Sequence, residues 1–207
     1  DSGRYRLFAS GNLAKGDFNV YRQFVELALS FVAPGGAAAQ IVPENLYNGA
    51  NASAIRKEIF EKFRVAAFWG FENTREVWFK GVDSRMKFVL YSVFRGSPEA
   101  EIPVAFALNN SSALENLSQR ALLLPVALMT EFSPDTYAVM EFSNQFEIDI
   151  AKGMYSKYPK LGDAVDGWPM WNPLRELDMG TDNELFENNI AGLPLYQGSM
   201  VTHHDYR

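Results

Sequence analysis

The chain has 207 residues, 19 basic and 25 acidic side chains, and a formal net charge of −6. Its 47% hydrophobic content provides a core for one domain or one and a half, and excludes an intrinsically disordered chain. The absence of cysteine excludes disulfides and thiolate chemistry, and the acidity argues against a general polyanion binder. No apolar run spans a membrane and no signal peptide is evident, so we expect a cytoplasmic protein without membrane contact.

The first strong pattern covers residues 18–32, where apolar residues recur every three or four positions, as in a helix with one buried face. Asp17 is placed to cap this helix, and Pro34 with the glycines after it ends the helix. The short apolar run 37–42 has no alternation and is flanked by glycine and proline. It therefore predicts a strand buried on both faces inside a parallel sheet.

A second helix is expected at residues 52–63, and strands at 65–71 and 86–94, which are rich in β-branched and aromatic residues. The order helix, strand, helix, strand, loop, strand is typical of half an open α/β sheet. The second helix is expected to face inward with Ile55, Ile59, Phe60 and Phe63, and to face solvent with Arg56 and its other charged residues.

A seam rich in glycine, serine and proline at residues 96–99 predicts a division into residues 1–96 and 97–207. Beyond it, residues 137–142 predict a strand and 144–158 a helix capped by Ser143. Residues 113–129 and those after 160 give no clear assignment. The side chains expected on the buried side of the helix at 144–158 are Phe146, Ile150, Met154 and Tyr155.

Tests for common catalytic and metal-binding motifs are negative. The Gly35-Gly36 turn follows a helix, so it lacks the amide cradle of a phosphate loop. Asp135 and Glu141 match a nuclease pattern only in part, because serine stands where lysine is needed. His203 and His204 are adjacent and would point to opposite sides of an extended chain. No metal site is therefore expected.

The segment 72–87 is the most informative for function. It places Trp78 and Phe79 among basic residues on a polar connection between two expected strands. Aromatic and basic residues together suit base stacking and phosphate contact. The alternative, which composition alone favours, is that Val77, Trp78 and Phe79 anchor the loop to the core. The basic residues of the segment are Arg75, Lys80, Arg85 and Lys87.

Four blocks of sequence occur in an order that is familiar. Residues 18–24, running into 32–36 and 41–43, are similar to NLYxxF…LLKPGG…IVP. The similarity continues through residues 55–57, 77–79, 82 and 87–88. Residues 177–186, LDMGTDNELF, are similar to FDMTNDSxLF, and residues 193–200, LPLYQGSM, to LPLYEGKM. In this series the chain resembles adenine-specific DNA methyltransferases, particularly the type IIG restriction–modification enzymes.

The resemblance implies an α/β fold, the C-terminal half of a partial Rossmann-like methyltransferase sheet, followed by an α+β segment leading into a target-recognition region. It implies that S-adenosylmethionine methylates the exocyclic amine of an adenine flipped out of double-stranded DNA. By match to the family's motifs, Phe24 packs on the cofactor's adenine ring and Phe79 stacks on the flipped base. Arg75, Lys80, Arg85 and Lys87 are the expected DNA contacts.

Two motifs of the family are missing from the sequence: the glycine-rich cofactor loop and the catalytic Asn-Pro-Pro-Tyr. Asn172-Pro173 is followed by Leu174 and lies in the wrong part of the order. We therefore expect a fragment of a restriction–modification or phage-defence methyltransferase, inactive alone and completed by the N-terminal part of the enzyme or by a partner subunit. The alternatives are a non-catalytic DNA-binding or subunit-docking module of a split enzyme, and an unrelated α/β domain.

Overall fold

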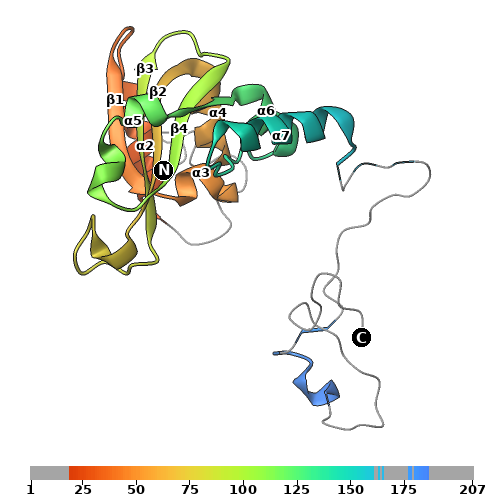
Figure 1. Cartoon of the computed structure of the whole chain (residues 1–207). Coiled ribbons are helices and arrows are strands. Elements are labelled where there is room, and N and C mark those ends of the chain that lie inside the picture. The colour runs from red at the N-terminus through yellow and green to blue at the C-terminus, as the bar shows by residue number, and fades with distance from the viewer. Residues whose placement is uncertain (1–18, 161–162, 164, 166–176, 179, 187–207) are drawn as a thin grey trace. The chain divides into compact units, whose positions relative to one another are not determined.

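The computed structural model describes residues 19–160, 163, 165, 177–178 and 180–186 (Figure 1). The chain divides into two compact units, Asp1–Lys160 and Leu161–Arg207. The division expected at residues 96–97 therefore falls inside the first unit. The segments expected to matter at 172–173, 193–200 and 203–204 lie outside the described residues.

The first unit is built on a five-stranded mixed sheet with the strand order β1-β3-β2-β4-β5. The strand β3 runs antiparallel to both of its neighbours, β1 and β2. The middle strand β2 is parallel to β4, and β4 is antiparallel to β5. The strands expected at 65–71 and 86–94 are confirmed as β2 and β3. The strand bounds are β1 Ala37–Pro43, β2 Phe63–Glu72, β3 Lys87–Arg95, β4 Glu101–Leu108 and β5 Leu122–Pro125.

β1 is not the interior strand of a parallel sheet that its sequence predicted. It pairs only with β3 among the described strands, antiparallel from Ala37 opposite Phe94 to Pro43 opposite Phe88. Only Val42 of β1 is buried. The prediction failed because three of the apolar residues in this run are alanines. Their small side chains contribute little free energy on burial, so they do not determine which side of the strand is buried.

The two helices expected first are confirmed with shorter bounds, as α2 and α4. Val20 is the N-cap residue of α2, in place of the expected Asp17, which lies outside the described residues. The helices are α2 Tyr21–Phe31, α3 Asn45–Asn48, α4 Ser53–Lys62, α5 Leu117–Arg120, α6 Val126–Phe132 and α7 Gln145–Lys157. Short 3-10 turns are η2 Ala50–Ala52, η3 Thr74–Glu76, η4 Ser111–Leu114 and η5 Asn183–Leu185.

The main hydrophobic core joins α2, α4, α6 and α7 to one face of the sheet. The inward residues expected for the second helix are all buried, although Phe63 belongs to β2. A smaller cluster on Phe71, Ala105 and Leu108 lies apart from this core. Helices packed on a mixed five-stranded sheet make this unit a mixed α/β domain. The finer assignment, a Rossmann-like methyltransferase sheet, stays a prediction.

Arg56 was expected to face solvent and is instead fully buried in α4. Its guanidinium donates hydrogen bonds to the carbonyl oxygens of Leu46, Gly49 and Thr136. Burial lowers the pKa of Arg56 to about 10. The helix pattern could not reveal this, because the carbonyl partners lie in α3, in the chain after it and 80 residues away.

The region before α7 also differs from expectation. Residues 137–142 form no strand; they run irregularly, with the Val139 amide donating to the carbonyl of Tyr47. The helix α7 is confirmed, but its side-chain cap is Asn144 instead of Ser143. Phe146, Ile150 and Met154 are exposed, not buried as expected, and α7 packs through Ile148 and Ala151, with Tyr155 partly buried against the core.

Within the second unit, the described residues include part of the segment similar to FDMTNDSxLF. Asp178 accepts hydrogen bonds at Oδ1 from the amides of Gly180 and Thr181, and its own amide donates to Asp182. None of the helices among the described residues is long and apolar enough to cross a membrane.

Candidate functional site

Residues 73–86, here called the β2–β3 loop, leave the sheet at the end where β1, β2 and β4 finish (Figure 1). The loop is closed at its base by Glu72 opposite Lys87 in the strand register. In open α/β sheets, ligands commonly bind beyond the carboxyl ends of the strands. The loop that the sequence singled out therefore occupies a position suited to binding.

Asn73 organises the loop from a fully buried position. Its side-chain amide donates to the carbonyl oxygens of Phe79 at 2.9 Å and Val82 at 3.0 Å. Its side-chain oxygen accepts from the amides of Trp78 at 3.2 Å and Phe79 at 2.9 Å. Two donors and two acceptor positions are the full capacity of this side chain. Asn73 thus holds both the amide and the carbonyl of Phe79.

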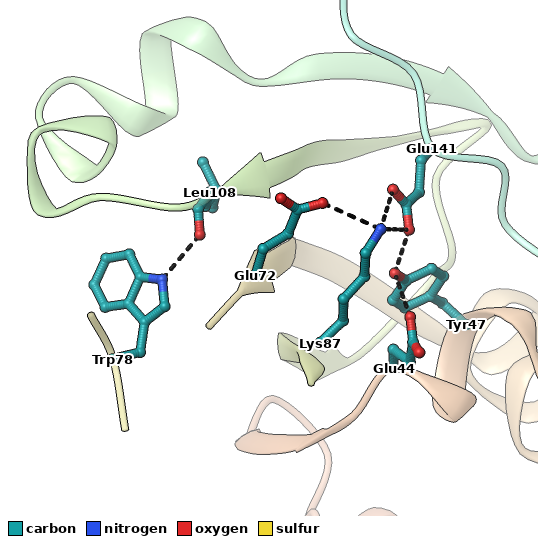
Figure 2. Close-up of polar contacts among 7 residues, drawn as sticks. All are labelled: Glu44, Tyr47, Glu72, Trp78, Lys87, Leu108 and Glu141. Carbon is teal, nitrogen blue, oxygen red and sulfur yellow. Dashed lines mark hydrogen bonds and ion pairs between the residues drawn. The ribbon is translucent and has the colours of Figure 1, made fainter. Parts of the chain in front are cut away.

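A row of four aromatic rings connects the loop to the sheet. Phe71 and Phe88 stack with centroids 4.9 Å apart, and Trp78 and Phe79 pack edge-on against Phe71 and Phe88 respectively. The Trp78 indole also donates to the carbonyl of Leu108 at 2.9 Å (Figure 2). Trp78 therefore anchors the loop, as the alternative interpretation expects. Phe79 has Phe88 behind it and stays 43% exposed.

The β2–β3 loop that carries Phe79 also carries other exposed apolar and basic side chains. Val77, Val82 and Met86 are each 40–50% exposed. The expected DNA contacts Arg75 and Lys80 are exposed and form no ion pair with another described residue. Arg75 also has a left-handed backbone with φ 55°, a conformation that is uncommon for residues other than glycine.

The other two expected DNA contacts are already paired. Arg85 forms an exposed bridge of 2.6 Å with Asp83, whose pKa is lowered by the Arg85 hydrogen bonds. Lys87 lies 3.2 Å from Glu72 and 3.0 Å from Glu141. Burial disfavours the charge of Lys87, but the hydrogen bonds to the two glutamates raise its pKa above the ordinary value. A phosphate would have to compete with these carboxylates.

Lys87 belongs to a polar cluster that sequence reasoning did not find (Figure 2). The buried Tyr47 hydroxyl donates to Glu141, and Glu44 lies 3.4 Å from the same hydroxyl. Burial and the Glu141 hydrogen bond raise the pKa of Tyr47. The cluster fixes residues 137–142 against the loop base. Tyr47, Lys87 and Glu141 are far apart in sequence, so no local signal joined them.

Phe24, the expected cofactor contact, is 60% exposed on α2. The side-chain amide of Gln40 donates to the Phe24 carbonyl at 3.3 Å, and the buried Tyr91 hydroxyl donates to the oxygen of that amide. Gln40 is three residues before Pro43, which pairs with Phe88 beneath Phe79. Three residues of strand span about 10 Å, so the Phe24 backbone and the ring behind Phe79 contact β1 at two separate points, Gln40 and Pro43.

The described residues contain no group of three or more histidine, aspartate or glutamate side chains placed to hold a metal ion. The features described at this end of the sheet are the aromatic rings, the exposed cations of the β2–β3 loop, and Lys87 between two carboxylates.

No family model matches the chain, and no curated protein does. Three solved structures similar to parts of it come from restriction–modification enzymes. The type IIG restriction endonuclease BpuSI is 18% identical over 51% of this chain and 12% of that one, with a TM-score of 0.38. A structure from a type I restriction–modification system is 18% identical over 46% and 19%, with a TM-score of 0.37.

The ATP-dependent type ISP restriction–modification enzyme LlaBIII, solved bound to DNA, is 12% identical over 57% of this chain and 9% of that one, with a TM-score of 0.38. The chain spans less than a fifth of the length of each of these three structures. At these scores the likeness assigns neither a fold nor an activity to this chain.

Proposed function

We propose that the chain is part of a site-specific adenine DNA methyltransferase of a restriction–modification system, and that its β2–β3 loop contacts DNA at a flipped adenine. The observation that carries the proposal is Phe79, a partly exposed ring backed by Phe88 and held at its backbone by Asn73. Unpaired bases bind to aromatic rings flanked by cations. Arg75 and Lys80 supply those cations on the same loop. The sequence resemblance independently assigns base stacking to Phe79.

The proposed methyl donor is S-adenosylmethionine. Phe24 fits one part of that role, because its exposed ring offers an apolar face to a purine. The groups that would hold the rest of the cofactor and polarise the target amine belong to the two motifs that this sequence lacks. In this proposal Phe24 packs on the cofactor and Phe79 stacks on the flipped base. The catalytic groups come from another polypeptide segment.

The test is fluorescence anisotropy of the chain with a labelled duplex that contains one unpaired adenine, for which extrusion costs little. We expect Phe79→Ala to weaken binding about 5- to 150-fold, the equivalent of one lost base stack of about 1–3 kcal/mol. Phe79→Tyr keeps the ring and should bind like the unmodified chain. Phe31→Ala removes a ring that is 76% exposed on α2 and serves as the matched control. Equal effects of Phe79→Ala and Phe31→Ala would refute the role of Phe79.

A subunit-docking module is the second candidate, favoured by the exposed apolar residues of α2 and β1. Phe31 is 76% exposed and Ile41 55% exposed. Exposed apolar side chains beside a strand that has one described partner suit the addition of a further strand. In this case Ile41→Lys should abolish association with the segment that carries the missing motifs, while Phe79→Ala leaves it unchanged.

A further inference from the structure

The helix α7 has two apolar faces, and one of them is exposed. Four large apolar side chains, here called the α7 stripe, are exposed: Phe146 (72%), Ile150 (45%), Met154 (56%) and Tyr158 (58%). They follow one another at intervals of four residues, the first three within α7 and Tyr158 as its C-cap residue, so they form one ridge along the helix that ends at its C-cap.

The other face already attaches α7 to the domain. Ile148 and Ala151 are buried, and the Tyr155 ring lies 5.8 Å from Phe132 of α6. The α7 stripe is therefore not needed to hold the helix in place. Four large apolar side chains in a row are costly to leave in water, which marks the ridge as an interaction surface.

We propose that the α7 stripe binds the α7 stripe of a second copy of this chain, with the two helices antiparallel. The stripe is symmetric about Lys152: a twofold axis there places Phe146 opposite Tyr158 and Ile150 opposite Met154 of the other copy. The same axis places Glu147 opposite Lys157. The acidic first turn and basic last turn of α7 are thus complementary to themselves.

The backbone geometry favours the same pairing. Antiparallel helices bring opposite ends of their dipoles together. Gly153 lies between the two central stripe residues, and a Cβ added there would meet nothing within 4 Å, so another helix has room to approach. A twofold contact of this kind closes on itself and stops at a dimer.

The expected dimer is weak, because one helix pair buries less than a standard interface of about 1,600 Å². Sedimentation equilibrium of the full chain should give a concentration-dependent dimer, with a dissociation constant in the micromolar range. Met154→Glu puts a charge at the centre of the ridge and should weaken the dimer at least tenfold. Circular dichroism of this variant verifies that α7 still forms.

The charge arrangement has its own matched pair of variants. Lys157→Glu places a glutamate opposite Glu147 and should weaken the dimer. Lys152→Glu makes the same change in charge two residues from both Ile150 and Met154, on the other side of the helix, and should leave the dimer unchanged. Equal effects of the two substitutions would overturn the proposed orientation.

Cross-linking tests the register directly, because the chain has no cysteine of its own. A mixture of Ile150→Cys and Met154→Cys chains should form disulfide-linked pairs faster than either variant alone, since the twofold axis brings these positions together. The proposal is overturned if the chain is monomeric at every concentration, if Met154→Glu leaves the dimer intact, or if the mixture cross-links no faster. It does not depend on the proposed methyltransferase role.

Discussion

Asn73 fixes the position of Phe79 through four hydrogen bonds within the β2–β3 loop. Asn73→Ala should leave buried backbone groups unpaired, at a cost of about 1–3 kcal/mol for each group that water cannot reach. We expect earlier unfolding in urea and faster proteolytic cleavage within residues 73–86. Asn109→Ala, at an exposed asparagine after β4, is the control. Unchanged cleavage of the loop in Asn73→Ala would show that the loop holds its shape without this side chain.

Asn73→Ala should also weaken binding of the unpaired-adenine duplex, although residue 73 is too deeply buried to touch DNA. The effect should be smaller than that of Phe79→Ala, because the ring is kept and only its placement is lost. Asn73 is thus a positioning residue.

Phe24 and Phe31 lie on α2 with 60% and 76% of their surface exposed. If Phe24 packs on the adenine ring of the cofactor, Phe24→Ala should raise the dissociation constant for S-adenosylmethionine about tenfold, as expected for loss of an aromatic contact of about 0.5–1.5 kcal/mol together with its buried area. Phe31→Ala should leave it unchanged. Calorimetry on the enzyme that also carries the cofactor loop measures both. Two equal dissociation constants would remove Phe24 from the cofactor site.

At the scale of elements, Arg56 joins α4 to the chain around α3 and to Thr136. Arg56→Lys keeps the charge but loses the planar fork that reaches these carbonyl oxygens together. We expect destabilisation of about 1–3 kcal/mol for each carbonyl left unpaired. Urea denaturation measures it against Lys62→Met, which removes an i,i+4 bridge from the exposed Lys62 to the half-buried Glu58 that is worth less than about 1 kcal/mol. If Arg56→Lys costs no more than Lys62→Met, these contacts do not hold the elements together.

Periodicity predicted α2, α4, β2, β3 and α7 because each has large apolar residues at the spacing of its own backbone. It could not choose between the two apolar faces of α7, since Phe146, Ile150 and Met154 are as regular as Ile148, Ala151 and Tyr155. The apolar residues of 137–142 predicted a strand, but Val139 and Phe142 are buried in the core without strand partners. Tertiary partners decide such cases.

The candidate site, like the fold, was predictable only where a local sequence pattern carried the information. Aromatic and basic residues on a polar connection identified the β2–β3 loop and Phe79. The sequence carries no local signal for the hydrogen bonds of Asn73, nor for the bridge from Lys87 to Glu141, which joins residues 54 apart. Pairing of Arg85 and Lys87 with carboxylates likewise depends on the folded chain.

At the scale of the whole molecule, three buried tyrosines tie stability to pH. Burial raises the pKa of Tyr21 to about 12, and burial also raises those of Tyr47 and Tyr91 above the ordinary value of 10.0. Below pH 10 all three phenols are protonated in both the folded and the unfolded chain. Above it the unfolded chain loses these protons first, so the free energy of unfolding must fall as the pH rises.

The slope for each phenol rises to about 1.4 kcal/mol per pH unit only when the pH is about a unit above 10, so the three together lower the free energy of unfolding by about 4 kcal/mol between pH 9 and pH 11. Urea denaturation between pH 9 and pH 11 should show this decline. The chain has nine tyrosines, and the part of the phenolate absorbance that comes from the three buried ones should appear only with unfolding. Tyr47→Phe and Tyr91→Phe should each reduce the slope by about a third, and the double variant by about two thirds. Tyr47→Phe should also lower stability at neutral pH, because Glu141 loses a buried donor. A free energy of unfolding that stays level across this range would mean that these hydroxyls ionise without leaving the core.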